Sequence, residues 1–423
     1  MSSEMIATGA HALAVGAICP VAAEDERPRY AVDGQVPAVV AFPRAPEEVG
    51  RLVALAGEHG WAVTPWGGGT HMALGDRPRR VDLVICTTGL ADLVEYQPAN
   101  LTCTVQAGVR LPDLQRVLRE QGQMLPLDPP KPEQATVGGL IACNSSGPAR
   151  ARYGTCRDVL IGIQVVNDAG TLTRAGGRVV KNVTGYDLCK LYTGSLGTLG
   201  IITEATFKVW PLRERESTVL ASYRELAPAW ETVRALFRAG LPVHACELLL
   251  PSASEGRGYL LAIRLGGGQA SLNRQKADVT TICSAGFPPQ QTRAIEIVEG
   301  DTAPDFWQSL ASYGWAEHDL VARVSAPPAS LGQLLAALPR DAIAVAHALS
   351  GVAYVYGLGR SVLADVVAQV QNACLVLEQC SPWEKAQGSV WGPVGPEFAL
   401  MRRVKEQFDP RGIFNPGRFV GGL

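Results

Sequence analysis

The chain has 423 residues, 47% of them apolar, which is enough to bury the cores of two or three domains. Its formal net charge of −2 gives no electrostatic support for binding nucleic acid. No apolar stretch approaches the ~20 residues of a membrane-spanning helix, and Glu4 stands where a signal peptide carries a basic residue. We therefore expect a cytoplasmic chain without direct membrane insertion, for which any membrane association would come through partner subunits.

The ten cysteines are scattered along the chain, and no CxxC pair is among them. Iron–sulfur clusters and structural zinc ions need closely spaced thiolate ligands. We therefore expect no metal centre held by this chain alone, and thiols that are reduced and mostly buried.

The first half of the chain predicts short strands and helices separated by glycine-rich loops. A proline-delimited helix precedes AVTPW (62–66), a strand that runs into three glycines. Further elements follow in this order: a strand at 81–87, a strand at 101–108, an amphipathic helix at 111–122, a hairpin at 158–177 that turns at 168–170, and a long strand at 200–212.

From about residue 213 the pattern changes to two strands between successive helices. Strands are predicted at 218–223, 244–250, 259–265, 320–325, 342–349 and 352–358, and helices at 226–238, 270–285, 304–313 and 330–338. This alternation favours a separate α+β domain, an antiparallel sheet with helices on one face. The closing FDPRGIFNPGRF is punctuated by proline and glycine, and we expect it to dock on another part of the protein.

The stretch TPWGGGTHMALGD (64–76) places three successive glycines after a strand. It lacks the GxGxxG spacing of a dinucleotide fingerprint, and the chain has no GxxxxGK[ST], HExxH or GxSxG pattern. Residues without Cβ let the backbone approach a ligand closely, and successive N–H groups can converge on a diphosphate. By itself, however, such a run is more typical of a glycine-rich surface turn.

Two later segments are also rich in small residues. The segment ATVGGLIACNSSGPARARYGTC (135–156) leaves room for a flat ligand, and GSLGTLGII (194–202) is a glycine-rich loop that enters a strand. The order and spacing of the three segments resemble the FAD-binding domain of the vanillyl-alcohol oxidase/p-cresol methylhydroxylase (PCMH) family of FAD-linked oxidases. Within it, KNVTGYDLCKLYTGSLGTLGIITEATFKVWP (181–211) and the closing segment look most like FAD-binding subunits of bacterial glycolate oxidase complexes.

The resemblance implies an α+β fold with a defined domain order. An N-terminal segment (1–29) precedes a two-subdomain PCMH-type FAD-binding domain (30–212). A shortened antiparallel α+β cap domain (213–395) follows, and a C-terminal helix and tail (396–423) return to the FAD domain.

The cofactor that the resemblance implies is FAD. Backbone hydrogen bonds to its diphosphate would come from Gly67, Gly68, Gly69 and Thr70. The ribityl and isoalloxazine side would be bordered by Gly139, Ser145, Ser146 and Gly147, and further parts of the cofactor by Gly154, Gly200, Ile201 and Ile202.

The histidine after the glycine run bears on how FAD is attached. Some relatives bind FAD covalently through a histidine that ends this run, as in RSGGH, but Thr70 occupies that position here and His71 comes one residue later. The resemblance therefore implies non-covalent FAD, with His71 a satisfied surface or loop residue. Trp66 replaces an arginine that is common in this loop, and we expect it to pack rather than to stack on the cofactor.

The chain departs from its relatives where they bind substrate. Relatives that oxidise 2-hydroxy acids carry a metal-binding HxGDGNxH-like stretch and an EHG motif, whereas AHALSGVAYVYGLG (346–359) retains only His347, so metal-assisted chemistry is not expected. Oxidation of a hydroxy acid needs a base and a cation for the carboxylate. His347 and Arg323 are candidates, although a structural role suits each better. Lys181, Asp187 and Lys190 lie in the segment that resembles the family, but a buried ion pair that supports the flavin loop explains their presence as well as a catalytic role does. The catalytic residues therefore stay unassigned.

The leading hypothesis is an FAD-binding subunit of a glycolate (2-hydroxy acid) oxidase or dehydrogenase complex. A sister FAD-linked catalytic subunit would supply the metal-assisted substrate site, and an iron–sulfur subunit would carry electrons onward. The alternatives are a non-catalytic assembly module that keeps the flavin fold, and a stand-alone oxidase of another alcohol or sugar acid.

Overall fold

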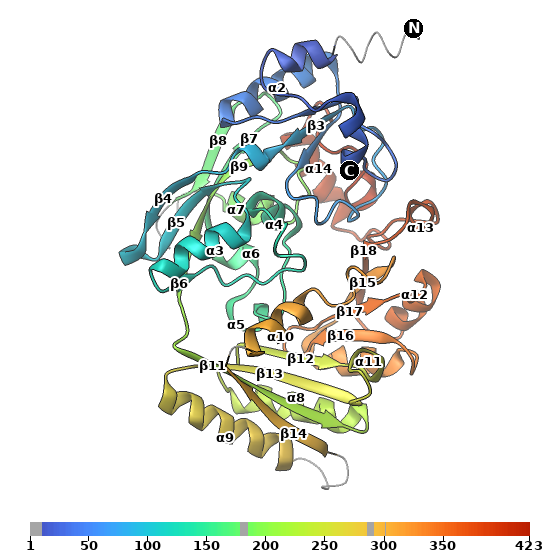
Figure 1. Ribbon diagram of the computed structural model, residues 1–423. Coiled ribbons are helices and arrows are strands. Elements are labelled where there is room, and N and C mark those ends of the chain that lie inside the picture. The colour runs from blue at the N-terminus through green and yellow to red at the C-terminus, as the bar shows by residue number, and fades with distance from the viewer. Residues whose placement is uncertain (1–10, 178–184, 286–291, 301) are drawn as a thin grey trace.

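The first lobe begins with a small parallel sheet in the computed structural model, which describes residues 11–177, 185–285, 292–300 and 302–423 (Figure 1). Its strands follow the order β1 (Val39–Ala41), β3 (Leu83–Cys86) and β2 (Val63–Trp66). Helix α2 (Pro46–His59) covers this sheet with the apolar face that its sequence spacing predicts. Left-handed Gly60 ends the helix.

The second sheet of this lobe is antiparallel. Its strand order is β4 (Leu93–Gln97), β5 (Thr102–Gln106), β9 (Ile201–Lys208), β7 (Leu160–Val166) and β8 (Leu172–Gly176). Helices α3 (Leu111–Glu120) and α4 (Val137–Cys143) pack into its core. Strand β9 links the two subdomains, because Ile201 is buried with α2 and Ile202 is buried with α3.

Short elements complete the first lobe. Strands β6 (Gln123–Met124) and β10 (Trp210–Pro211) pair with each other, and further short helices include α5 (Arg150–Tyr153), α6 (Cys156–Val159) and α7 (Leu188–Tyr192).

The second lobe, which we term the cap, is built on a larger antiparallel sheet. Its strand order is β14 (Thr292–Glu299), β11 (Arg215–Tyr223), β13 (Tyr259–Gly267), β12 (Ala245–Leu249), β16 (Ile343–His347), β17 (Val352–Tyr356), β15 (Val321–Ser325) and β18 (Cys374–Gln379). One face is covered by α8 (Leu226–Ala239), α9 (Gln269–Ala285), α11 (Leu331–Ala337) and α12 (Arg360–Ala368). The α+β prediction is confirmed, with the difference that α10 (Thr302–Ala311) packs on the opposite face.

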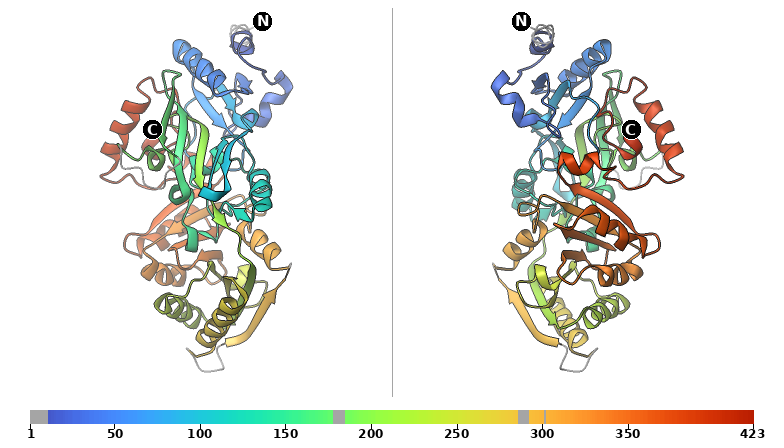
Figure 2. Two further views of the ribbon diagram at one scale, coloured as in Figure 1. Left: turned by 90° about the vertical axis from the view of Figure 1, so that its left-hand side faces the viewer. Right: turned by 90° about the vertical axis from the view of Figure 1, so that its right-hand side faces the viewer.

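After β18 the chain returns to the first lobe, as the sequence predicted. Helix α13 (Pro382–Ala386) is held by Lys385, whose Nζ lies 2.8 Å from Asp33 Oδ1. Helix α14 (Phe398–Phe408) packs against the antiparallel sheet of the first lobe, and both views of Figure 2 place it there. Buried Lys405 fixes the tail, since its Nζ lies 2.5 Å from Asp409 Oδ2 and donates to the backbone oxygen of Thr198 at 2.7 Å. No helix within the described ranges is long and apolar enough to cross a membrane.

Candidate functional site

The glycine loop after β2 is pressed against the segment that leads into α4. A Cβ atom on Gly67 would lie 2.2 Å from Thr136 Oγ1, and one on Gly68 would lie 1.6 Å from the backbone oxygen of Gln134. Gly69 has a φ of +74°, in the left-handed region that favours glycine. Close approach or backbone conformation therefore accounts for each glycine of the run.

Two adjoining pockets open between this loop, α4 and the segment before β9. They share Pro65, Gly67, Gly139, Ala142 and Gly197 in their walls. Because backbone and apolar side chains form much of these walls, the two pockets together suit an elongated ligand with a flat apolar part.

The structure brings together most of the small residues that the sequence singled out. The predicted residues that line the two pockets are Gly67, Gly68, Gly69, Thr70, Gly139, Gly200, Ile201 and Ile202. Ser145 lies at their edge, where its Oγ is 3.1 Å from Nε2 of the pocket residue His71.

Three other predicted residues are not in the lining of these pockets. Ser146 is buried. A Cβ atom on Gly147 would lie 1.9 Å from the backbone oxygen of Asp128, and Gly154 has a φ of +78° between α5 and α6. Local packing and backbone conformation explain these two glycines without a ligand.

The C-terminal tail supplies two polar pocket residues that the sequence analysis missed. Asn415 and Arg418 line the first pocket. Asn415 Nδ2 donates to the backbone oxygen of Leu196 at 2.7 Å, and Arg418 Nη2 donates to that of Met72 at 2.7 Å. The proline and glycine of the tail predicted that it docks. The polar side chains of Asn415 and Arg418 in this docking segment were the signal that could have indicated a site.

His71 joins the glycine loop to the cap. Its Nδ1 lies 2.9 Å from Thr70 Oγ1, its Nε2 lies 3.1 Å from Ser145 Oγ, and its ring centroid lies 5.8 Å from that of Trp315 in the cap. The structure thus gives this histidine hydrogen-bond partners for both nitrogens. The expectation of a satisfied surface or loop residue is met, and His71 also lines the first pocket, where burial lowers its pKa.

Other residues singled out in the sequence have structural contacts. Trp66 packs edge-on against Tyr30 with ring centroids 5.2 Å apart, and it also borders the second pocket. Asp187 is exposed and caps α7 by accepting the N–H of Lys190, so these two do not form the buried ion pair that was considered. Lys181 lies outside the described residues.

The cap presents a polar cluster on the sheet face that α10 shares. Alternation along β12, β16 and β17 places Glu247, His347 and Tyr354 on that face. His347 Nδ1 lies 2.7 Å from Glu247 Oε2, whereas His347 Nε2 and Glu247 Oε1 find no hydrogen-bond partner in the described part of the protein. Burial raises the pKa of Glu247, and the adjacent His347 opposes this shift.

Arg323, the other candidate from the sequence, has a carboxylate partner. It lies within β15 rather than at a strand end, and its Nε donates to Glu378 Oε1 on β18 at 2.6 Å. Its charge is therefore balanced inside the sheet. Across the ranges that the structure describes, no group of three or more His, Cys, Asp or Glu side chains is arranged to hold a metal ion.

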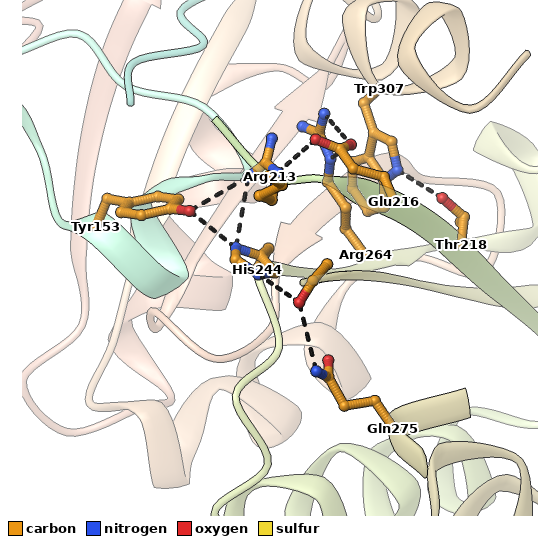
Figure 3. Close-up of polar contacts among 9 residues, drawn as sticks. Tyr153, Arg213, Glu216, Thr218, His244, Arg264, Gln275 and Trp307 are labelled. Carbon is orange, nitrogen blue, oxygen red and sulfur yellow. Dashed lines mark hydrogen bonds and ion pairs between the residues drawn. The ribbon is translucent and has the colours of Figure 1, made fainter. Parts of the chain in front are cut away.

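A hydrogen-bond network fixes α5 of the first lobe to the cap (Figure 3). Tyr153 Oη lies 3.0 Å from His244 Nδ1, and Arg213 Nη1 lies 3.4 Å from each of these atoms. Arg213 also pairs with Glu216, which Arg264 contacts from β13 at 2.7 Å. Burial and the charge of Arg213 lower the pKa of His244 to about 4, so the ring is neutral near pH 7 and its Nδ1 can accept a hydrogen bond from the Tyr153 hydroxyl group.

The pocket residues fit the flavin nucleotide that the resemblance implies. The N–H groups of Gly68 and Gly69 make no backbone hydrogen bond with the described residues, so they are available to a diphosphate. Buried polar atoms are normally hydrogen-bonded, yet two atoms of pocket residues, Asn415 Oδ1 and Arg418 Nε, have no partner in that same part of the chain. A ligand with phosphate and ribityl oxygens would supply the missing partners.

Comparison with protein-family models gives two matches. A model described as FAD binding domain matches residues 37–176, and one described as FAD linked oxidases, C-terminal domain, matches residues 391–419.

Several curated proteins are similar over most of the chain. The glycolate oxidase subunit GlcE of Escherichia coli is 30% identical over 340 residues, which cover 78% of this chain and 85% of GlcE. The D-2-hydroxyglutarate dehydrogenase of Xanthomonas citri pv. viticola is 29% identical over 428 residues, covering 90% of this chain and 89% of that protein. The glycolate oxidase subunit GlcD of Bacillus subtilis is 33% identical over 277 residues, covering 62% of this chain, and the chain spans 58% of the length of GlcD.

Solved structures share the fold at low sequence identity. A structure of p-cresol methylhydroxylase with substrate bound has a TM-score of 0.76 and 16% identity, covering 99% of this chain and 97% of that chain. An alkyldihydroxyacetonephosphate synthase structure has a TM-score of 0.69 and 21% identity, covering 90% and 76%. Taken with the family models and GlcE, these matches show that the chain belongs to the FAD-linked oxidases with a PCMH-type FAD-binding domain, and that its cofactor is FAD.

Proposed function

We propose that this chain is an FAD-binding subunit of a complex that oxidises small 2-hydroxy acids, with glycolate the first substrate to test. The observation that carries the proposal is a row of ring contacts that connects the pocket proposed for FAD to the polar cluster of the cap. The ring centroids of His71 and Trp315 lie 5.8 Å apart, those of Trp315 and Tyr354 lie 5.8 Å apart, and those of Tyr354 and His347 lie 5.5 Å apart. Relatives named for glycolate, lactate and hydroxyglutarate support the substrate class.

The residues of the pocket would hold the cofactor without a covalent bond. The N–H groups of Gly67, Gly68 and Gly69 would bind the diphosphate, and Ile201 and Ile202 would border the flavin or the adenine edge of the cofactor. FAD supplies the acceptor for the hydrogen and two electrons that leave the carbinol carbon of a hydroxy acid. What remains for the protein is to exclude water, bind the carboxylate and hold a hydrogen-bond acceptor next to the hydroxyl group.

The proposed partners are a sister FAD-linked catalytic subunit and an iron–sulfur subunit. Two relatives, GlcD and GlcE, are named as subunits of glycolate oxidase. The cysteines of this chain are free thiols without the spacing that a cluster needs, so onward electron transfer through iron and sulfur would require another chain.

Co-purification from the native cell tests this proposal. We expect a second flavoprotein and an iron–sulfur protein to accompany the chain, and the complex to reduce an artificial acceptor with glycolate. Full glycolate turnover by the chain alone would contradict the division of labour. If neither the chain nor its complex shows flavin reduction by glycolate, D-lactate or D-2-hydroxyglutarate, the proposed substrate class is wrong.

A further inference from the structure

Helix α5 carries an arginine to the boundary between the lobes. Figure 1 shows α5 between the first lobe and the cap sheet, and α5 contacts strand β12. Arg150 and Tyr153 are three residues apart, so their side chains share one side of this helical turn. Tyr153 is tied to His244, which precedes β12 (Figure 3). Arg150 therefore stands on a helical turn that is anchored to the cap.

The guanidinium of Arg150 lacks a counter-charge of its own. It is half-buried and forms no hydrogen bond or ion pair with the residues that the structure describes. Its charge nevertheless acts on the polar cluster of the cap, because burial raises the pKa of both Glu247 and Tyr354 and the positive charge of Arg150 opposes both shifts. A half-buried cation without a partner is stabilised when an anion binds to it.

His347 presents a free ring nitrogen in the same cluster. Glu247 fixes its Nδ1 at 2.7 Å, and Nε2 is left without a partner in the described ranges although the side chain is 5% exposed. A carboxylate on one nitrogen orients an imidazole so that the other nitrogen can meet a ligand. Asp128, a further carboxyl group near His347, accepts the N–H of Ala149 at 2.9 Å, and burial raises its pKa to about 6.

We infer that Arg150 and the Glu247-oriented His347 form the site that binds a small 2-hydroxy acid between the lobes. The carboxylate of the acid pairs with Arg150, and its hydroxyl group donates a hydrogen bond to His347 Nε2. The first contact comes from the FAD-binding lobe and the second from the cap, so the acid is held where the two lobes meet. This inference rests on the proposed function, which supplies the class of substrate.

Binding of oxalate to the full chain loaded with FAD tests the carboxylate contact independently of turnover. Oxalate carries the carboxylate but has no carbon-bound hydrogen to lose. By titration calorimetry we expect Arg150→Met to weaken oxalate binding at least tenfold, while Arg152→Met, an exposed arginine in the same helix, binds like wild type. The visible flavin spectrum and melting temperature show whether each variant keeps FAD and its fold.

A conservative variant decides the question if Arg150→Met fails to fold. Arg150→Lys keeps a positive charge but cannot make a bidentate contact, so we expect it to bind oxalate several-fold more weakly than wild type. Reduction of this chain's own flavin by glycolate, followed by stopped-flow absorbance, gives the second readout, because it does not depend on turnover by a sister subunit. There Arg150→Lys should raise the half-saturating glycolate concentration with the limiting rate little changed, and His347→Gln should lower the limiting rate.

The possible failures are distinguishable. If wild type binds oxalate and the two Arg150 variants bind it equally well, this inference is overturned while the proposed function stands. If wild type binds no oxalate and no 2-hydroxy acid reduces the flavin in the chain or in its complex, the proposed function fails as well.

Discussion

Replacing Gly68 by alanine is the sharpest perturbation of the FAD pocket that the structure offers. The new Cβ would lie 1.6 Å from the backbone oxygen of Gln134 and 2.8 Å from its carbonyl carbon. Real Cβ atoms essentially never approach a neighbour closer than 3.0 Å, so the loop and the segment before α4 must separate by about 1.4 Å. Both partners are backbone, and no flexible side chain can absorb the movement.

The magnitude follows from the cost of overpacking. Forcing one extra carbon into a packed site costs about 1–3 kcal/mol, and here the strain is relieved by moving the loop whose N–H groups are expected to bind the diphosphate. Each 1.4 kcal/mol corresponds to a factor of about ten in affinity. We therefore expect Gly68→Ala to weaken FAD binding by about 10–100-fold while the cap remains folded.

The assay is titration of the apoprotein with FAD, followed by quenching of flavin fluorescence. Gly359→Ala is the matched control, because a Cβ atom there meets nothing within 4 Å and its backbone is extended. The reasoning is refuted if Gly68→Ala binds FAD as tightly as wild type while the control also behaves normally.

Three further predictions concern the tail, the lobe junction and the cofactor bond. Lys405→Met leaves the buried carboxylate of Asp409 unpaired and should lower the free energy of unfolding by about 3–5 kcal/mol in urea titrations, whereas Arg402→Met, in an exposed pair, should change it by less than about 0.5 kcal/mol. The folded protein holds the pKa of His244 at about 4, whereas an unfolded histidine titrates near ~6.5, so the stability that neutral His244 gives above about pH 6.5 is lost as the pH falls toward 4. Between pH 7 and pH 5 the free energy of unfolding of wild type should therefore fall by about 2 kcal/mol more than that of His244→Gln. An identical fall in both would refute this, and His59→Gln is the exposed control. Acid precipitation should release FAD into the supernatant, and yellow colour that stays with the pellet would contradict non-covalent binding.

The sequence predicted the interior of the sheets better than their edges. Helices α2, α3 and α8 were recognised because their apolar residues recur at helical spacing and are buried as that spacing requires. Strands β1, β4, β6, β14 and β18 were missed, and each lies at the end of its sheet order. An edge strand exposes side chains on both faces, as Leu93 and Val94 do in β4, so its sequence lacks a clear alternation.

The same physics limited the prediction of the site. The glycine segments could be read because glycine itself marks close approach and unusual backbone conformation. The partner of His347 could not be predicted, since Glu247 is 100 residues away in the sequence and only the register of β12 and β16 places it opposite. The tail was expected to dock, but no local pattern places its Asn415 at the pocket, and none brings Trp315 of the cap to the pocket region.

A crystal structure of the chain grown with FAD tests the central claim most directly. We predict the diphosphate against the backbone N–H groups of Gly67, Gly68 and Gly69, with the flavin or the adenine edge of the cofactor beside Ile201 and Ile202. Density for FAD at any other place, or crystals that stay colourless in excess FAD with the glycine loop closed onto β9, would contradict the account.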